Sequence, residues 1–439
     1  MKRLIYNRLI EWKNSTNRKP LLLQGARQVG KTYLVNEFGK KEYTDFITLN
    51  FEENPGLKTL FAGDLSPQTI LENISIYIGK KITSENTLLF FDEIQIVPEV
   101  LTSLKYFYEK APEYHIIAAG SLLGVSIGKP TSFPVGKVNF LSMYPMNFTE
   151  FLWALEETFL AEKISTIKKI KPLPDIIHEK IIKLYKQYLF TGGMPEVLQK
   201  YIDTKDIALV RHTQNEILEA CKRDFSKYND KTQALKTAEV WQSIPFQLAR
   251  ENKKFKYSDV RKKARASTFE STIEWLKGAG LIHLAYNVTT PKLPLPGYTD
   301  YSKFKVYMPD AGLLGAMLNL PSSTIMSPDD IFREYNGAFI ENFVAQELTA
   351  QGISPLFYWT SKSDAEVDFL LQKENRIYPL EVKSGTSLKL KSLRSYADKY
   401  HPDHIFRASS RNFTQSGNFV NIPLYSIYNF MNLIPQPEK

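Results

Sequence analysis

Two short segments near the N-terminus contain residue types that bind and hydrolyse a nucleoside triphosphate. The first segment fits the pattern G-x-x-x-x-G-K-T, which begins at Gly25 and ends with Gly30, Lys31 and Thr32. In such a loop the glycines let backbone N–H groups turn toward phosphates, the lysine reaches the β- and γ-phosphate oxygens, and the threonine hydroxyl binds Mg²⁺. An apolar run precedes the pattern and a helix-like stretch follows it, so we predict a loop that binds ATP or GTP together with magnesium.

The second segment is an apolar run that ends in two carboxylates, Asp92 and Glu93. An aspartate at the end of a buried strand binds Mg²⁺ through water, and a glutamate beside it activates the attacking water. Another apolar run leads to Ser121, whose hydroxyl we expect to sense the γ-phosphate; the alternative is that Ser121 only begins a turn. Lys31, Glu93 and Ser121 are therefore the predicted catalytic residues of the hydrolysis site.

A further set of charged residues lies in two short apolar runs near the C-terminus. Asp368 interrupts the first run, and Glu381 and Lys383 end the second, with a polar turn over residues 372–376 between them. This pattern is typical of a β-hairpin, in which residues two apart project from the same face of a strand. Because an unpaired charge inside a strand is costly, these residues are either a salt-bridged strand edge or a functional site.

The composition is that of a globular protein with more than one core. The chain has 439 residues, of which 43% are hydrophobic and 23% charged, so it is too long for a single domain and ordinary in its hydrophobic content. No apolar run approaches the ~20 residues that span a bilayer, and the basic N-terminus lacks a secretory apolar core. The single cysteine, Cys221, excludes an internal disulfide framework. We expect a cytoplasmic protein without a membrane partner, and its net charge of +9 permits a nucleic-acid partner without requiring one.

The patterns around these residues predict four domains. Residues 1–149 alternate strand and helix patterns, which is typical of a parallel sheet flanked by helices. Residues 150–227 have helical periodicity, as expected for a helical lid on the nucleotide. Residues 228–324 show helices followed by two strands with a proline-rich connection, which predicts a winged helix, and residues 325–439 contain the C-terminal hairpin.

The predicted winged helix is basic. Its wing would consist of strands at 281–288 and 304–308. Lys262 and Lys263 lie in its predicted second helix, which opens at Ser258, and Arg265 lies before the third helix at 268–278. A basic winged helix often contacts DNA, so these three residues are candidate nucleic-acid contacts. The alternatives are a module that packs against the rest of the chain and a charged face in solvent.

The order of these motifs resembles the prokaryotic AAA-superfamily ATPases that carry a C-terminal PD-(D/E)XK nuclease-like domain of unassigned function. The resemblance covers nearly the whole chain and rests on the segments GARQVGKTYLVNEF, LLFFDEIQ, GSLLG, FPVGKVNFLSMYPMNFTEFL, TGGMPEVL and EVDFLL…EVKSG. It implies a multidomain α/β protein with a P-loop ATPase core, an α-helical lid, a winged helix and a C-terminal α/β restriction-endonuclease-like domain.

The resemblance also implies roles for residues outside the phosphate-binding loop. Gly193-x-Pro195 is similar to the GxP motif of signal-transduction ATPases, in which the proline of the lid closes on the nucleotide. The family usually has an arginine where this chain has Lys137, and a lysine lacks the guanidinium fork, so no arginine finger is assigned. Assembly into a homo-oligomer or with a protein partner therefore stays open.

At the C-terminus the resemblance joins Glu341 to the residues of the hairpin. Glu341, Asp368 and Glu381 would hold a second divalent cation, and Lys383 would stabilise the transition state of phosphodiester cleavage. The expected function is that of an ATP-binding and ATP-hydrolysing protein whose nucleotide state controls a nuclease-like domain acting on nucleic acid. The alternative is an ATP-dependent switch that binds DNA or a protein partner and does not cut.

Overall fold

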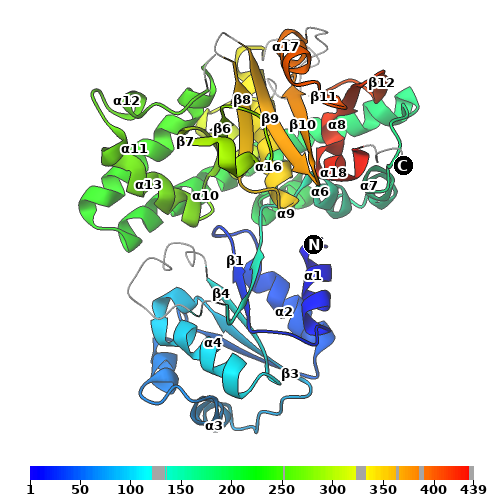
Figure 1. Cartoon of the computed structure of the whole chain (residues 1–439). Helices are drawn as coiled ribbons and strands as arrows, with labels where there is room; N and C mark the ends of the chain where they lie inside the picture. Colours follow the sequence, from blue (N-terminus) through cyan, green and yellow to red (C-terminus); the bar gives the residue numbers. More distant parts are fainter. Residues whose placement is uncertain are drawn as a thin grey trace. The chain divides into compact units, whose positions relative to one another are not determined.

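The computed structural model describes residues 1–120, 134, 136–250, 253–322, 333–361, 365–384 and 390–434. The chain divides into two compact units. The smaller unit comprises residues 2–144 with 278–280, and the larger unit comprises 145–277 and 281–439 together with Met1. Each unit contains one β-sheet with helices packed against it (Figure 1).

The smaller unit contains a five-stranded parallel sheet. Its strands, in the spatial order β2-β3-β4-β1-β5, are β1 (Leu21–Gln24), β2 (Asp45–Asn50), β3 (Thr87–Asp92), β4 (His115–Gly120) and β5 (Asn139–Ser142). All six residues of β3 are buried, as are the three leucines of β1, which is the pattern of strands covered on both faces. The parallel sheet predicted for residues 1–149 is confirmed.

Helices cover the two faces of this sheet, and they are α1 (Ile5–Lys13), α2 (Lys31–Glu42), α3 (Pro67–Ile78) and α4 (Pro98–Lys110). On one face Ile70 of α3 and Leu104 of α4 share a core with Phe91 of β3. Phe90 points to the opposite face because side chains alternate along a strand. There Phe90 stacks on Phe46 of β2, which in turn lies against α2. The carboxyl ends of β1 and β3 consequently meet at one edge of the sheet.

The larger unit begins with the residues predicted as a lid, and these are helical as expected. The helices of this segment are α6 (Phe148–Ala154), α7 (Thr158–Ser165), α8 (Asp175–Thr191), α9 (Pro195–Thr204) and α10 (Ile207–Tyr228). The helices that follow are α11 (Lys231–Leu248), α12 (Tyr257–Val260), α13 (Ala266–Gly278) and α14 (Ala311–Met317).

An eight-stranded mixed sheet occupies the rest of the larger unit. In the spatial order β12-β13-β11-β10-β9-β8-β6-β7 it contains β6 (His283–Val288), β7 (Thr299–Tyr307), β8 (Leu356–Thr360), β9 (Glu366–Lys373), β10 (Arg376–Val382), β11 (Ile405–Ser409), β12 (Thr414–Ser416) and β13 (Phe419–Pro423). The described residues of this unit also form the α-helices α16 (Arg333–Ala350), which packs on β6, β7 and β10, α17 (Lys391–Tyr400) and α18 (Phe430–Leu433). The predicted hairpin is confirmed, because β9 and β10 are antiparallel with Lys373 opposite Arg376.

The two strands predicted as a wing take a different place. β6 and β7 pair in antiparallel fashion, as in a wing, but β6 also pairs in parallel with β8. Every residue of β6 from Leu284 to Val288 is buried, so both faces of the strand need cover, which an isolated two-stranded wing does not supply. The sheet therefore continues across the predicted boundary at residue 324. The winged helix and the restriction-endonuclease-like fold stay predictions.

Candidate functional site

The phosphate-binding loop leaves β1 at Gln24 and enters α2 at Lys31, which is the strand–loop–helix order that the motif predicts. Gly30 has φ +95°, in the left-handed region that favours glycine. A Cβ atom on Gly25 would lie 2.2 Å from the carbonyl oxygen of Met143, so a larger residue does not fit there. Backbone conformation at Gly30 and close packing at Gly25 therefore favour glycine at both positions of the motif. The loop ends at the N-terminus of α2, where an anion is favoured.

Lys31 lies inside this loop and is only 6% exposed. Its ammonium group donates hydrogen bonds of 2.9 Å to the carbonyl oxygens of Gly25 and Ala26. Burial lowers the pKa of Lys31 to about 8, although the nearby carboxylates of Glu93 and Asp92 act in the opposite direction. A nucleotide would bring phosphate charge to this ammonium and favour its protonated form.

The second motif meets the first at the carboxyl end of the sheet. The Thr32 hydroxyl donates a hydrogen bond of 2.7 Å to Asp92 Oδ2, and the Glu93 N–H donates one of 3.0 Å to Asp92 Oδ1. Burial raises the pKa of Asp92, and the hydrogen bond from Thr32 opposes that rise. A hydroxyl and a carboxylate side by side are hard oxygen donors of the kind that Mg²⁺ takes, so the residues present fit the expected ion.

Glu93 follows Asp92 with φ +55°, a left-handed conformation that is rare outside glycine and costs free energy. Its carboxylate accepts a hydrogen bond of 2.5 Å from Gln95 Nε2. At this residue the chain leaves the direction of β3, at the edge of the sheet where the phosphate-binding loop lies. Ser121 follows β4 directly and lies outside the described residues.

The GxP motif belongs to the larger unit, where Pro195 begins α9. The Gly193 N–H donates a hydrogen bond of 2.6 Å to Asp310 Oδ2, and the Gly193 carbonyl accepts one of 2.7 Å from the Met146 N–H. A Cβ on Gly193 would lie 1.9 Å from the Met146 carbonyl oxygen. The loop that precedes Pro195 is therefore held tightly by two other segments of the same unit.

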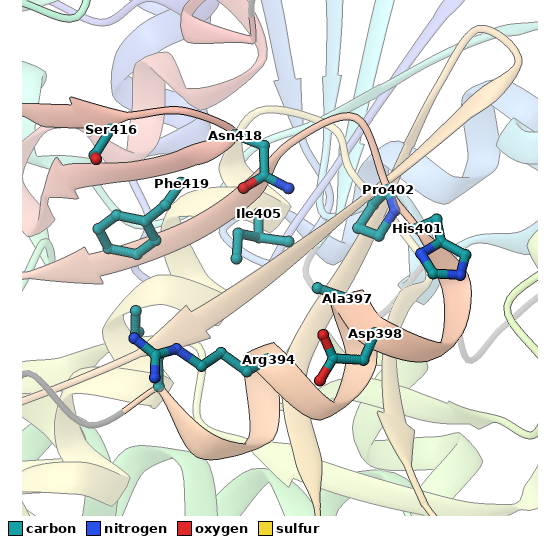
Figure 2. Close-up of a pocket in the computed structure, with 10 residues that line it drawn as sticks. Arg394, Ala397, Asp398, His401, Pro402, Ile405, Ser416, Asn418 and Phe419 are labelled. Carbon is teal, nitrogen blue, oxygen red and sulfur yellow. The ribbon is translucent and has the colours of Figure 1, made fainter.

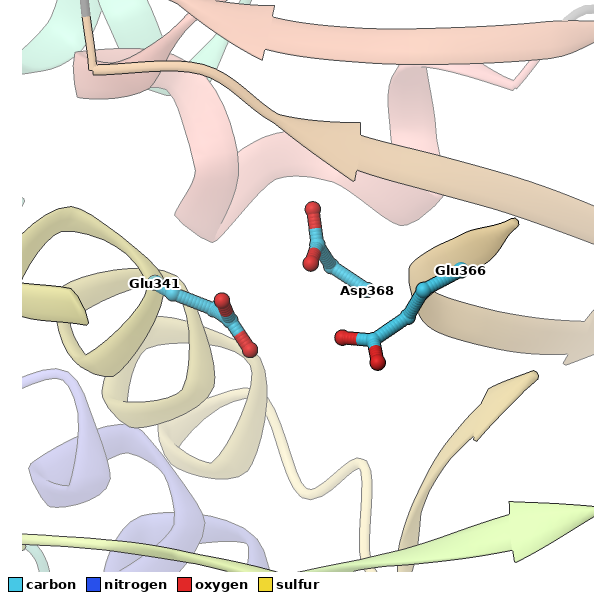
Figure 3. Close-up of side chains that lie close together, drawn as sticks. All are labelled: Glu341, Glu366 and Asp368. Carbon is cyan, nitrogen blue, oxygen red and sulfur yellow. The ribbon is translucent and has the colours of Figure 1, made fainter. Parts of the chain in front are cut away.

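Three acidic side chains converge in the larger unit, and two of them, Glu341 and Asp368, are residues predicted to bind a second cation. Glu341 of α16 meets Glu366 and Asp368 of β9, and one oxygen atom from each lies within 4.8 Å of the others (Figure 3). Asp368 also accepts a hydrogen bond of 2.7 Å from the Val382 N–H of β10. Glu341 and Asp368 are thus brought together as predicted. We call Glu341, Glu366 and Asp368 the carboxylate cluster.

Glu381, the third predicted ligand, is not among those three residues. It is buried, and its Oε1 lies 2.7 Å from the Lys383 ammonium. Glu366 takes the place in the cluster that the sequence analysis gave to Glu381. The signal was present, since Glu366 and Asp368 are two apart and project from one face of β9.

A buried lysine contacts all three members of the carboxylate cluster. The ammonium of Lys305, from β7, lies 2.8 Å from Glu341 Oε1 and 3.8 Å from Asp368 Oδ1, and it also pairs with Glu366. Glu341 receives two further contacts, an ion pair with Lys253 and a hydrogen bond of 2.5 Å from the Tyr307 hydroxyl.

The electrostatics of the cluster follow from burial and from these ammonium groups. Burial would raise the pKa of Glu341, but Lys253 and Lys305 outweigh it and hold the pKa at about 2. Burial and the charge of Glu341 raise the pKa of Asp368 to about 7, against the influence of Lys305. Glu341 is therefore held in its ionised form, while Asp368 takes up a proton more readily than an ordinary aspartate.

A cavity of about 670 Å³ opens over the cluster. Its lining includes Glu366, Asp368 and Glu381, and it also includes Lys253, Lys254, Lys303 and Lys383. A second cavity of about 670 Å³ lies beside α17, where Arg394, Asp398 and His401 line it together with residues of β11 and β13 (Figure 2). Only the first cavity brings together residues singled out from the sequence.

The residues proposed to contact nucleic acid lie elsewhere in the larger unit. Lys262, Lys263 and Arg265 are exposed on the connection between α12 and α13. Nearby Arg261 is paired with Glu239 of α11 at 2.7 Å. These exposed side chains are available to a partner, but their exposure alone does not identify one.

Three family models match parts of the chain. Residues 17–152 match a model described as an AAA domain, residues 182–324 match a domain of unknown function (DUF8612), and residues 336–427 match a further domain of unknown function (DUF4143). Residues 17–152, which contain both the phosphate-binding loop and the strand ending in Asp92 and Glu93, are therefore similar to an AAA domain. In the described part of the chain, no helix combines the length and apolar character needed to cross a bilayer.

Two curated proteins share a shorter stretch with this chain. Uncharacterized protein Mb2031c of Mycobacterium bovis and uncharacterized protein Rv2008c of Mycobacterium tuberculosis are each 31% identical to it over 93 residues. The stretch spans 21% of this chain and 20% of the length of each relative.

Solved structures with distant similarity to this chain include the following two. The Walker-type ATPase PABY2304 of Pyrococcus abyssi is 15% identical, with 72% of this chain and 95% of that chain covered and a TM-score of 0.45. The ORC1 protein of Aeropyrum pernix, solved in complex with DNA, is 11% identical, with 72% and 91% covered and a TM-score of 0.31.

Proposed function

We propose that this chain binds and hydrolyses ATP and that its nucleotide state controls the domain built around the carboxylate cluster. The observation that carries the first part is the hydrogen bond of 2.7 Å between Thr32 and Asp92, formed beside the buried ammonium of Lys31. It brings the two motifs of the sequence together at the N-terminus of one helix, where the phosphates of a nucleotide are favoured.

In the proposed reaction each residue has a separate task. Lys31 exchanges its carbonyl partners for the β- and γ-phosphate oxygens, and Thr32 and Asp92 hold Mg²⁺, which neutralises phosphate charge when bound. Glu93 accepts the proton of the attacking water. Ser121 contacts the γ-phosphate. The pKa of Lys31, about 8 without nucleotide, keeps most of the side chain positively charged at neutral pH.

The second part of the proposal rests on helix α16, which contacts the segment around the GxP motif and also carries Glu341. Gln346 of α16 accepts a hydrogen bond of 2.9 Å from the Ala311 N–H and donates one of 2.7 Å to the Tyr188 hydroxyl. Asp310, the residue before Ala311, accepts the hydrogen bond from Gly193. One face of α16 thus touches the GxP loop through Asp310, and Glu341 lies on the same helix inside the carboxylate cluster.

This arrangement supports a route from the nucleotide to the C-terminal domain. If Pro195 closes on ATP, Gly193 moves with it and changes the positions of Asp310 and of α16. The buried hydrogen bonds along the route resist independent movement, because a buried donor left without an acceptor costs free energy.

Hydrogen exchange tests this control. We expect a non-hydrolysable ATP analogue to change amide exchange in residues 338–349 of the wild-type protein. Asp310→Ala removes the acceptor of the Gly193 N–H and should abolish that change while ATP still binds. Asp300→Ala is the matched control, since it removes an aspartate of β7 that contacts Lys303 and Ser302 instead. An unchanged response in Asp310→Ala would remove this route from the proposal.

We consider two alternatives for the function, or output, of the C-terminal domain. In one, Glu341, Asp368 and Glu381 bind a second divalent cation and Lys383 assists cleavage of nucleic acid; in the other, the domain binds a partner without cutting. The contacts of Lys305 favour the second alternative. Lys262, Lys263 and Arg265 are the proposed contacts if that partner is DNA, and a homo-oligomer or another protein is the remaining choice. A cytoplasmic location is proposed with either output.

A further inference from the structure

We propose that Lys305 is the resident cation of the carboxylate cluster and that it replaces a divalent ion there. The C-terminal domain would then act without metal-dependent cleavage of phosphodiesters. This inference deepens the proposed function, because it selects the binding output over the cutting output. It does not depend on ATP hydrolysis and is testable without nucleotide.

The position of Lys305 is the first argument. The three residues that could hold an ion, Glu341, Glu366 and Asp368, are the same three that surround its ammonium group. An ammonium has three N–H donors, which suits three carboxylates. Metal ligands must offer free lone pairs to the ion, whereas Glu341 Oε1 already accepts from both Lys305 and Tyr307.

Burial is the second argument. The Lys305 side chain is 0% exposed and reaches the cluster from β7, the edge strand of the sheet, which pairs with β6. An ion that displaced this ammonium would leave a buried positive charge without the carboxylates that balance it, which is strongly unfavourable.

Charge balance is the third argument. The cluster holds three carboxylates, and two ammonium groups, those of Lys305 and Lys253, contact Glu341 directly. A divalent ion placed among the same oxygens would lie next to both ammonium groups and be repelled by them. Carboxylate oxygens are suitable ligands for a hard cation, but these oxygens already pair with the ammonium groups of Lys253 and Lys305.

The test is a Mn²⁺ titration of the full chain without nucleotide, followed by calorimetry and by the electron paramagnetic resonance signal of free Mn²⁺. We expect wild type and Asp368→Asn to bind Mn²⁺ alike at millimolar ion, because the cluster contributes no site. Lys305→Met removes the charge while keeping a long side chain, so this variant should bind one more Mn²⁺ ion than wild type. The double variant Lys305→Met/Asp368→Asn should lack this additional ion. Lys303→Met, two residues earlier on β7, is the matched control and should gain none.

The wild-type comparison decides the matter even if Lys305→Met does not fold. A Mn²⁺ site in wild type that disappears in Asp368→Asn would overturn the inference, as would metal-dependent cleavage of DNA or RNA that Asp368→Asn abolishes. A chain that fails to hydrolyse ATP yet shows no such Mn²⁺ site would contradict the proposed ATPase and leave this inference standing.

Discussion

The phosphate-binding loop of the smaller unit and the carboxylate cluster of the larger unit both place a buried lysine near acidic side chains. In the loop, Lys31 donates to backbone carbonyls, and Asp92 accepts from a neutral hydroxyl. In the cluster, Lys305 donates to the carboxylates themselves. A lysine bound to weak, neutral acceptors can be transferred to an incoming phosphate, whereas a lysine in a buried ion pair cannot leave without exposing an uncompensated charge.

The comparison shows that residue types alone do not define a metal site. Acidic residues supply suitable ligands in both places. What differs is whether the positive charge that balances them comes from a ligand or from the protein's own chain. Three substitutions can break or sharpen this distinction, and each addresses one of the two lysines or the acid beside it.

The largest effect is expected for Glu93→Gln. The carboxamide cannot accept the proton of the attacking water, so the rate of ATP hydrolysis should fall by about 10²–10⁴-fold while ATP still binds. Turnover measured by phosphate release and ATP binding measured by calorimetry separate the two effects. Glu99→Gln on the exposed side of α4 is the control and should hydrolyse ATP normally. A Glu93→Gln rate within about threefold of wild type would assign the base to another residue, since a general base contributes at least ~10²-fold.

Lys305→Met should show the structural role of the second lysine. Removing one partner from a buried ion pair leaves the remaining carboxylates uncompensated, so the free energy of unfolding should fall by about 3–5 kcal/mol. Urea unfolding monitored by tryptophan fluorescence measures this free energy, and the transition of the larger unit is the one to compare. Lys303→Met breaks only the partly exposed pair with Asp300 and should cost less than about 1 kcal/mol. Equal effects of the two substitutions would mean that the cluster does not depend on Lys305.

Much of the smaller unit could be predicted from the sequence because its signals are local. The residues from Gly25 to Thr32 are contiguous, and Asp92 and Glu93 end a strand whose apolar run identifies it. Parallel strands then bring both segments to one edge of the sheet without further information. Contacts between residues that are distant in the sequence therefore did not have to be known for this prediction.

The carboxylate cluster could be predicted only in part because its decisive residue comes from a distant strand. Glu341 and Asp368 are identified from the sequence, but Lys305 lies in the segment 304–308 that is predicted to be a strand of a wing. Its burial follows from the pairing of β6 with β8, which sets the position of β7 relative to α16. Strand order in a mixed sheet is a tertiary property, and neither periodicity nor composition determines it.

The smallest effect, and the sharpest contrast between the two lysines, is expected in the pH dependence of ATP binding. Burial lowers the pKa of Lys31 from its ordinary value to about 8 in the empty site. Below pH 8 the side chain is an ammonium, so affinity for ATP is fully present; above pH 8 it loses its proton and affinity should fall by about tenfold per pH unit. The phosphates do not cause this decline, because a terminal phosphate with a pKa of about 6 is already ionised there.

Calorimetry between pH 7 and pH 9.5 would measure the change, with Lys31→Arg as the matched variant. Arginine keeps its charge throughout this range, so any ATP affinity retained by Lys31→Arg should be independent of pH. Lys305→Met should leave the pH profile of ATP binding unchanged, since Lys305 belongs to the other site. If the ATP affinity of wild type does not change between pH 7 and pH 9.5, Lys31 stays protonated in the empty loop throughout this range. That result would contradict the expectation that burial lowers the pKa of Lys31.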